Sequence, residues 1–309
     1  MGQGRAAVLA TAACVLAAAC WAANAVIAAG AFERGVTPER LAQARVIVAL
    51  VPLAAVLLVA RRSLIVPPRP AVPALVAFGA SMMVVNWAYY VAIDRVPVGV
   101  AISLQYTAPV IILAGVAISM RRVPPRVLWI AGGLTIVGAA LVSGTIGAEG
   151  GSRLDQVGLL AGIVSALSFA GYLVSAELAG RRGSHPVTTL LAGFLVAAAI
   201  WAVVQPLWGW PVDLLSDPQV AWRVVAVGLL GTLLPFALVV AALRWVTSAV
   251  AGIATTAEPV LAAMLAWLFL GQALGAAQLL GGALVVAGVL VAQLVRQPPP
   301  AAMPVELAP

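Results

Sequence analysis

The chain has 309 residues, of which 63% are hydrophobic and 9% are charged. Soluble domains are about one-quarter charged, so this chain carries too few charges to cover a surface that faces water. The composition excludes a soluble enzyme, a secreted disulfide-bonded module and a disordered chain. Only helices and closed barrels satisfy their backbone hydrogen bonds inside lipid. The hydrophobic runs continue for about 20 residues without alternating, which is typical of helical spans and not of barrel strands.

The inventory of charged and metal-ligating residues restricts the chemistry further. All 17 basic residues are arginines, and the absence of lysine excludes a Walker A loop and a Schiff-base cofactor. One histidine, His185, and two cysteines, Cys14 and Cys20, are too few for a metal site or a disulfide framework. We therefore expect no metal and no cofactor. The net charge of +7 is attributed to membrane topology and not to nucleic acid, because the arginines lie between hydrophobic runs.

The hydrophobic runs predict an all-α integral membrane protein with ten transmembrane helices. The first run begins like a signal peptide but continues to about residue 30, so we expect it to be a retained span. We predict two units of five spans, 8–146 and 156–294, and a disordered proline-rich tail over 297–309. The ten predicted spans are 8–30, 42–60, 72–93, 97–119, 127–146, 156–178, 187–205, 222–242, 249–270 and 275–294.

The arginines are distributed unequally between the two sides of the predicted membrane. With a cytoplasmic N-terminus, 11 of the 17 arginines fall inside and six fall outside. The positive-inside rule therefore predicts a multi-pass protein of the cell membrane with both termini in the cytoplasm. In this orientation Gly150 and Asp213 lie outside.

The two halves of the chain resemble each other at an offset of 150 residues. AIDRVPVGVAISLQYTAPV from Ala92 overlies ALRWVTSAVAGIATTAEPV from Ala242, and Pro109 matches Pro259. Each proline supplies no N–H for the carbonyl one turn earlier, which makes that carbonyl a candidate ligand contact unless neighbouring groups satisfy it. Because five is an odd number, the second unit enters the membrane from the opposite side. Such an inverted repeat is typical of secondary transporters that work by alternating access.

The chain resembles the EamA family of the drug/metabolite transporter superfamily over residues 8–294, most strongly in ALRWVTSAVAGIATTAEPVLAAMLAWLFLGQALGAAQLLGGALVVAGVLV. The resemblance implies a ten-helix transporter, usually an exporter of amino acids or other small metabolites. Family members often carry a glutamate after the glycine that ends the ninth span. This chain has Gln272 there and Arg122 at the matching point of the first half, so the role of that glutamate does not carry over.

Polar side chains inside the predicted spans are candidate ligand contacts, because they are costly in lipid and usually face a cavity. Trp21 and Asn24 are three residues apart and share one face of the first span. Asn86 and Tyr90 share a face of the third span. We predict that side chains from both halves converge near the membrane midplane, namely Trp21, Asn24, Asn86, Trp87, Gln105, Tyr106 and Thr255.

Structural interpretations of these residues stay open. An asparagine such as Asn24 often joins two helices by hydrogen bonds. Tyr89 and Tyr90 lie near the outer end of their span, where an interfacial aromatic belt is expected. Tyr172, in the sixth span, is a further candidate for the same cavity, and simple packing explains it equally well. Arg45 is a few residues into the second span, so we expect its side chain to reach outward and to serve topology or gating.

Glu258 is the one acidic residue that the sequence places deep within a span, and no basic residue is near it in the chain. An ionised carboxylate at this depth costs about 3 kcal/mol or more, so we expect Glu258 to be protonated much of the time. It is predicted to be the most consequential residue, as a proton-coupling site or as an anchor for an amine-bearing ligand. Thr255, one turn earlier, is a candidate hydrogen-bond donor to it. The alternative is a structural role, in which protonated Glu258 bonds a neighbouring helix.

These features predict a secondary transporter, and not an enzyme, that moves a small polar or amphipathic metabolite. The family resemblance implies an amino-acid-like solute and export as the direction. A sugar-phosphate or nucleotide-sugar exchanger ranks lower, because it needs buried lysine or arginine and none is expected near the midplane. An intramembrane enzyme also ranks lower, since the chain has no H-E-x-x-H or G-x-S-x-G motif. The expected partners are a small-molecule substrate, the lipid bilayer and a coupling proton, and no nucleic acid. The sequence does not specify the substrate, the direction of transport, the coupling or the oligomeric state.

Overall fold

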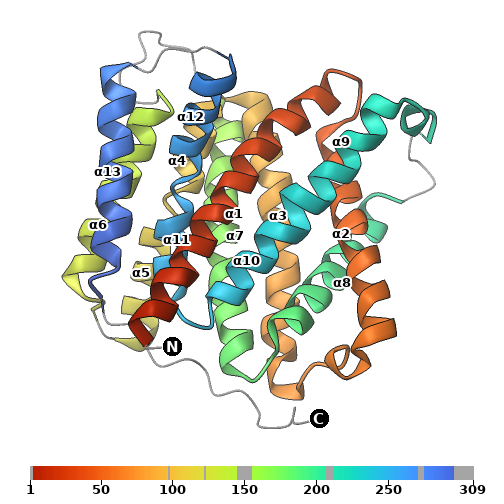
Figure 1. Ribbon diagram of the computed structural model, residues 1–309, viewed down its shortest axis with the longest axis horizontal. Helices are drawn as coiled ribbons and strands as arrows, with labels where there is room; N and C mark the ends of the chain where they lie inside the picture. The colour runs from red at the N-terminus through yellow and green to blue at the C-terminus, as the bar shows by residue number, and fades with distance from the viewer. Residues whose placement is uncertain are drawn as a thin grey trace.

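The computed structural model describes residues 3–96, 98–121, 123–144, 155–206, 212–270 and 275–295, which contain helices and turns but no strand (Figure 1). Arg122, Gly150, Gln272 and the predicted tail over 297–309 lie outside these described residues.

The first half of the described chain forms six helices and two short connecting turns. The helices are α1 (Gln3–Phe32), α2 (Pro38–Ala60), α3 (Val72–Arg95), α4 (Val98–Gln105), α5 (Ala108–Met120) and α6 (Arg126–Val142). The turns η1 (Arg62–Leu64) and η2 (Arg69–Ala71) join α2 to α3.

The second half has the same order of long helices, with one short turn before its third long helix and a π-helical turn inside that helix. Its elements are α7 (Gln156–Arg181), α8 (Pro186–Val204), η4 (Val212–Ser216), α9 (Pro218–Gly228), the π turn η5 (Leu229–Leu233), α10 (Leu234–Ala242), α11 (Ser248–Thr255), α12 (Glu258–Leu270) and α13 (Ala276–Ala292).

Side-chain caps fix where several of the helices begin. A cap side chain accepts a hydrogen bond from a backbone N–H that the first helical turn leaves unpaired. The caps are Thr37 for α2, Asp155 for α7, His185 for α8, Asp217 for α9 and Thr247 for α11. Three of these helices then start with proline, which has no N–H to lose at that position.

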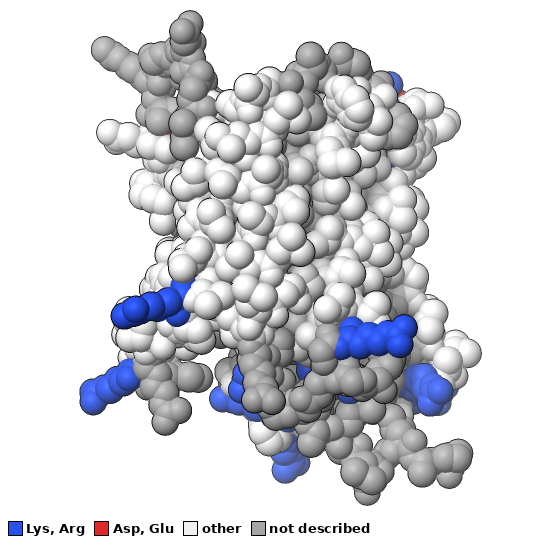
Figure 2. Space-filling view, turned by 60° about the vertical axis from the view of Figure 1, so that its left-hand side comes forward, with Lys and Arg blue, Asp and Glu red and all other residues white. Residues whose placement is uncertain are grey.

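Eight helical segments of the described chain are long and apolar enough to cross a membrane. They are α1, α2, α3, α7, α8 and the pairs α4–α5, α9–α10 and α11–α12. The predicted fifth and tenth spans correspond to α6 and α13, which are shorter apolar helices of 17 residues each. The structure therefore confirms an all-helical, multi-pass membrane protein. Figure 2 shows a wide band without charged side chains on one face, with arginines gathered below it.

Two of the long helices are broken at matching places in the two halves. In the first half, α4 ends at Gln105 and α5 begins at Ala108. In the second half, α11 ends at Thr255 and α12 begins at Glu258, which is 150 residues later in both cases. α6 and α13 have bounds that differ by the same 150 residues. The offset that the sequence showed thus recurs in the helix boundaries.

Helices of the first half pack against helices of the second half. α3 packs along α7, and α1 packs along α10. α6 lies beside α13 at one edge of the molecule (Figure 1). This last pair is in close backbone contact, because a Cβ atom at Gly138 of α6 would lie 2.6 Å from the carbonyl oxygen of Gly281 of α13. Between these pairs the interior is occupied by aromatic rings, with Tyr106, Tyr172, Phe78 and Phe194 among the largest fully buried side chains.

Candidate functional site

Aromatic rings from both halves meet in the interior and form one connected group. Phe169 and Tyr172 of α7 stack with their ring centroids 5.6 Å apart. Trp21 of α1 meets Phe169 edge-on at 6.1 Å and Phe236 of α10 at 5.7 Å. Tyr106, at the break after α4, meets Phe169 at 6.2 Å. Aromatic pairs favour such separations. We call Trp21, Tyr106, Phe169, Tyr172 and Phe236 the aromatic cluster.

Glu258 lies beside this cluster, at the first residue of α12. The hydroxyl group of Tyr106 donates a hydrogen bond to Oε2 of Glu258. The residue as a whole is half-buried, and Tyr89 of α3 and Arg45 of α2 lie close enough to interact electrostatically with its carboxyl group. Within the described part of the chain, Glu258 has no ion-pair partner. The carboxyl group is therefore held by Tyr106 and has no opposite charge bonded to it among the described residues.

Thr255 does not form the hydrogen bond to Glu258 that the sequence suggested. Its buried hydroxyl group donates to the carbonyl oxygen of Gly252 at 2.9 Å, one turn earlier in α11. Thr256 donates to the same carbonyl at 3.0 Å. A threonine in a helix can donate to the backbone carbonyl group three or four residues earlier. This local bond satisfies the hydroxyl group without a partner from another helix. Tyr106 supplies the donor to Glu258 instead.

Gln105 fixes the position of the break after α4. Its Oε1 accepts a hydrogen bond of 2.9 Å from the hydroxyl group of Ser165 of α7. This bond joins the end of α4 to α7 one residue before Tyr106. The half-buried side chain of Gln105 thus holds the helix end from which Tyr106 reaches Glu258.

Trp21 and Asn24 both face the segment that contains the π turn and α10. Trp21 contacts Phe236, and Asn24 packs so closely on Gly231 that a Cβ atom there would overlap its side chain. The buried Oδ1 of Asn24 has no hydrogen-bond partner among the described residues. Gly231 is therefore required for this contact between α1 and the π turn.

Arg45 is buried, with 3% of its surface exposed, so the expectation that it reaches outward is wrong. Its Nε donates to the hydroxyl group of Thr232 at 2.7 Å, and its Nη2 donates to the carbonyl oxygen of Gly231 at 2.6 Å. Its Nη1 donates to Oδ1 of Asn86 at 2.6 Å and to the hydroxyl group of Tyr90 at 3.2 Å. The physical reason is that α2 packs against both the π turn and α3, and these polar groups together replace water around the guanidinium.

Sequence reasoning therefore missed Arg45 as an interior residue. Two signals pointed to it, namely the glycine–threonine pair at Gly231 and Thr232 inside a span and the shared face of Asn86 and Tyr90. π turns within α-helices are also frequent at functional sites. The sequence alone does not show that these three helices meet at Arg45.

Trp87 is the predicted site residue that the structure leaves apart from the others. Its side chain is 42% exposed, and among the described residues it makes no ring contact with the aromatic cluster. Asn86, one residue earlier, points to Arg45. Successive residues of a helix are rotated by about 100°, so neighbours in sequence face different sides.

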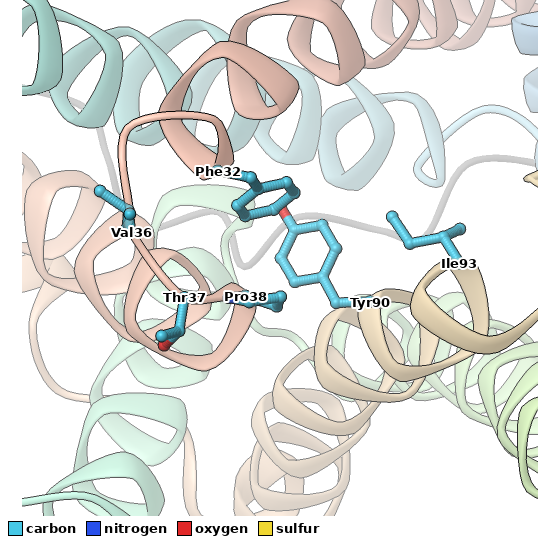
Figure 3. A pocket seen from close by; sticks show the side chains of 7 residues that line it. Phe32, Val36, Thr37, Pro38, Tyr90 and Ile93 are labelled. Carbon is cyan, nitrogen blue, oxygen red and sulfur yellow. The ribbon is translucent and has the colours of Figure 1, made fainter.

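A pocket of about 360 Å³ opens at the turn between α1 and α2 (Figure 3). The ring of Phe32 meets the ring of Tyr90 edge-on at 5.7 Å in this pocket. Tyr90 also accepts the hydrogen bond from Arg45, so its side chain separates the pocket from the guanidinium group. The pocket is lined by Phe32, Gly35, Val36, Thr37, Pro38, Tyr90 and Ile93.

An all-helical membrane protein made of two similar halves, with polar and aromatic groups gathered between them, has the architecture of a small-molecule transporter. The chain belongs to the EamA-like transporter family, whose sequence profile matches residues 8–144 and again residues 156–293. This match confirms the family resemblance seen in the sequence.

Individual relatives are also transporters. The chain is 30% identical to the threonine/homoserine exporter RhtA of Escherichia coli strain K12 over 220 residues, which are 69% of this chain and 68% of that protein. It is 29% identical to an uncharacterized transporter of Archaeoglobus fulgidus over 206 residues, which are 66% of this chain and 70% of that protein. One crystal structure, at 20% sequence identity, superposes with a TM-score of 0.74 and covers 93% of this chain and 97% of its own. That likeness shows the fold alone.

Proposed function

We propose that this protein is a secondary transporter that exports a small, amino-acid-like metabolite across the cell membrane. The observation that carries the proposal is the carboxyl group of Glu258, held by Tyr106 next to the aromatic cluster. A ligand amine would bind the carboxylate, and the apolar part of the ligand would lie against the rings. The name of the relative from Escherichia coli, a threonine/homoserine exporter, supports a ligand of this class.

Alternating access in this proposal is movement between two inverted five-helix units, 8–146 and 156–294. The matching helix breaks, and the packing of helices of one half against helices of the other, support such units. α6 and α13 would then also cross the membrane, which gives ten spans. With both termini in the cytoplasm, the arginines gathered at one end in Figure 2 would lie at the inner surface.

Glu258 would couple the solute to a proton in this transporter. One carboxylate cannot hold a proton and a ligand ammonium group at the same time, so the binding of each excludes the other. A proton arriving from outside would release the amine there, and loss of the proton inside would restore the binding site. Such exclusive binding produces exchange of one solute for one proton.

Arg45 bears on the second candidate, an exchanger of sugar phosphates or nucleotide sugars. It supplies the buried cation that the sequence seemed to lack. However, a phosphate monoester carries a charge of about −1.5 to −2, whereas one arginine and one ionised glutamate have a net charge of zero. The interior is therefore better matched to a solute without net charge, which favours the amino-acid-like ligand.

Reconstitution into liposomes tests the proposed function. Liposomes that contain the purified protein would be loaded with unlabelled L-threonine, L-homoserine, L-phenylalanine or glucose 6-phosphate. Uptake of the same compound in labelled form, by counterflow, would then be measured without ATP. We expect counterflow of at least one amino acid and none of the sugar phosphate. Liposomes with the relative from Escherichia coli serve as the positive control. Failure of every amino acid in liposomes where that control works would overturn the proposal.

A further inference from the structure

Arg45 brings a permanent positive charge into the interior without a carboxylate bonded to it. Its four hydrogen-bond partners are the side chains of Thr232, Asn86 and Tyr90 and the carbonyl group of Gly231, all of them uncharged. Within the described residues, Arg45 forms no ion pair. Arginine does not lose its proton in proteins, and a buried ion is costly unless an opposite charge accompanies it. The interior at this point therefore attracts an anion.

The two edges of the guanidinium group differ in their hydrogen-bond partners: those of one edge are fixed, and those of the other edge can be replaced by a ligand. Nε and Nη2 bond the π turn through Thr232 and the carbonyl group of Gly231, which are both buried. Nη1 faces Asn86 and Tyr90 of α3 instead. Asn86 is half-buried, and Tyr90 lines the open pocket shown in Figure 3. Because Tyr90 separates this pocket from the guanidinium group, a solute would meet the Nη1 edge only by displacing the oxygens of Asn86 and Tyr90.

The opposite charge nearby belongs to Glu258, but the two groups do not form an ion pair. Oε2 of Glu258 accepts from Tyr106, and the charge of Arg45 acts on Glu258 without a hydrogen bond between them. When Glu258 is ionised, the interior thus holds one cation and one anion, and neither forms an ion pair among the described residues. A solute with a carboxylate at one end and an ammonium group at the other would compensate both.

We infer that Arg45 is the residue that binds the carboxylate of the transported solute, and that the solute is a zwitterionic amino acid whose ammonium group binds Glu258. This inference rests on the proposed function and specifies its ligand. The carboxylate would take the place of the asparagine and tyrosine oxygens at Nη1 of Arg45, because a charge-assisted hydrogen bond is stronger than a neutral one. The side chain of the amino acid would contact the aromatic cluster.

Derivatives that lack one charge test the two ends of the ligand separately. The probes are L-threonine and L-phenylalanine, their amides, which lack the carboxylate, and their N-acetyl forms, which lack the ammonium group. The measurement is the half-maximal concentration of each probe for inhibition of amino-acid counterflow in liposomes. The wild-type protein is expected to bind each amide at least about tenfold more weakly than the amino acid.

Variants then assign the carboxylate to Arg45. Arg45→Gln is expected to weaken binding of the amino acid about tenfold or more and to leave binding of the amide unchanged. The ratio of their half-maximal inhibitory concentrations should therefore approach one. Arg45→Lys keeps the charge without the planar fork of the guanidinium group. Its ratio of half-maximal concentrations for amide and amino acid is expected to lie between the ratios of the wild-type protein and Arg45→Gln. Arg34→Gln, at an exposed arginine that bonds the carbonyl group of Gly30, is the control and should retain the wild-type ratio.

The outcomes separate this inference from the proposed function. Equal inhibition by amino acid and amide in the wild-type protein would overturn the role of Arg45 while transport itself stands, and this measurement needs no variant to fold. Equal weakening of acid and amide in both Arg45 variants would also overturn it, because a structural role affects both ligands alike. If no amino acid gives counterflow at all, the proposed function fails instead.

Discussion

Tyr106 donates a hydrogen bond to Glu258, 152 positions later in the chain, and the bond joins the breaks of two helices. Tyr106 lies in the break between α4 and α5, and Glu258 directly follows the break between α11 and α12. The two halves of the protein therefore meet at one carboxyl group. In the proposed function, a ligand or proton bound there would contact both halves and would bias their relative arrangement.

Tyr106→Phe tests this contact, because it removes the hydroxyl group and keeps the ring in the aromatic cluster. A hydrogen bond to a charged group contributes about 1.5–3 kcal/mol, so we expect the initial rate of amino-acid counterflow to fall at least about tenfold. Tyr172→Phe is the matched comparison, since the buried hydroxyl group of Tyr172 has no hydrogen-bond partner among the described residues. A larger loss for Tyr172→Phe than for Tyr106→Phe would contradict the assigned contact.

The sequence predicted the helices for clear physical reasons, although it predicted 97–119 and 249–270 as continuous spans and the structure breaks both. Hydrophobic runs of span length specify helices in lipid. Pro109 and Pro259 each lie at the second residue after a break, where they remove an N–H that a continuous helix would need. Tyr106 was identified as a candidate site residue because it is polar and lies shortly before Pro109, and Glu258 because it is the one acidic residue predicted deep within a span.

Arg45 and Trp87 show where the sequence was insufficient. An arginine eight residues into a helix that starts at Pro38 can reach the interface or turn inward, and the choice depends on what α2 packs against. The π turn and α3 decide it, and neither contact has a local signal in α2. Trp87 lies apart from the other candidates because α3 turns by about 100° per residue, which carries Trp87 to an exposed face while Asn86 points to Arg45.

Gly138→Ala tests the close packing of α6 on α13. The added Cβ atom would lie 2.6 Å from the carbonyl oxygen of Gly281, and overpacking of this kind costs about 1–3 kcal/mol. We expect a lower midpoint of thermal unfolding in detergent, measured by intrinsic fluorescence. Gly133→Ala in the same helix is the control, because nothing lies within 4 Å of its added Cβ atom. Equal midpoints for the two variants would show that the α6–α13 contact is looser than described.

His185 provides a prediction about pH at the start of α8. Its Nδ1 accepts a hydrogen bond of 3.3 Å from the backbone N–H of Val187, which requires that nitrogen to be unprotonated. Burial, and secondly the positive charge of Arg244, lower the pKa of His185. Because the folded pKa is below the unfolded value of about 6.5, the stabilisation is complete above that value and decreases as pH falls below it.

Hydrogen exchange of the first turn of α8 measures this effect, after correction for the intrinsic exchange rate. We expect protection to decrease between about pH 7.5 and 5.5 in the wild-type protein. His185→Asn keeps an acceptor for the cap without a titrating group, so its corrected protection should not change with pH. The same decrease in both proteins would assign the pH dependence to another group.

The orientation of the chain is testable at Asp213, which is exposed in the turn η4. Asp213→Cys, in a background where Cys14 and Cys20 are replaced by alanine, should react in intact cells with a thiol reagent that does not cross membranes. Gly150→Cys should react as well. The physical reason is the excess of arginines on the opposite side. If both positions react only after the cells are opened, the orientation is reversed.

Glu258→Gln tests the proposed coupling most directly. Glutamine keeps the shape of the side chain and can still accept the hydrogen bond from Tyr106, but it can neither ionise nor exchange a proton. We therefore expect a protein that folds normally in detergent and has lost amino-acid counterflow at every pH between about 5.5 and 8. Glu258→Asp keeps an ionisable group one methylene shorter and should retain part of the rate. A wild-type rate for Glu258→Gln over the whole range would leave Glu258 with a structural role, because neither ligand binding nor proton transfer can use an uncharged amide in this way.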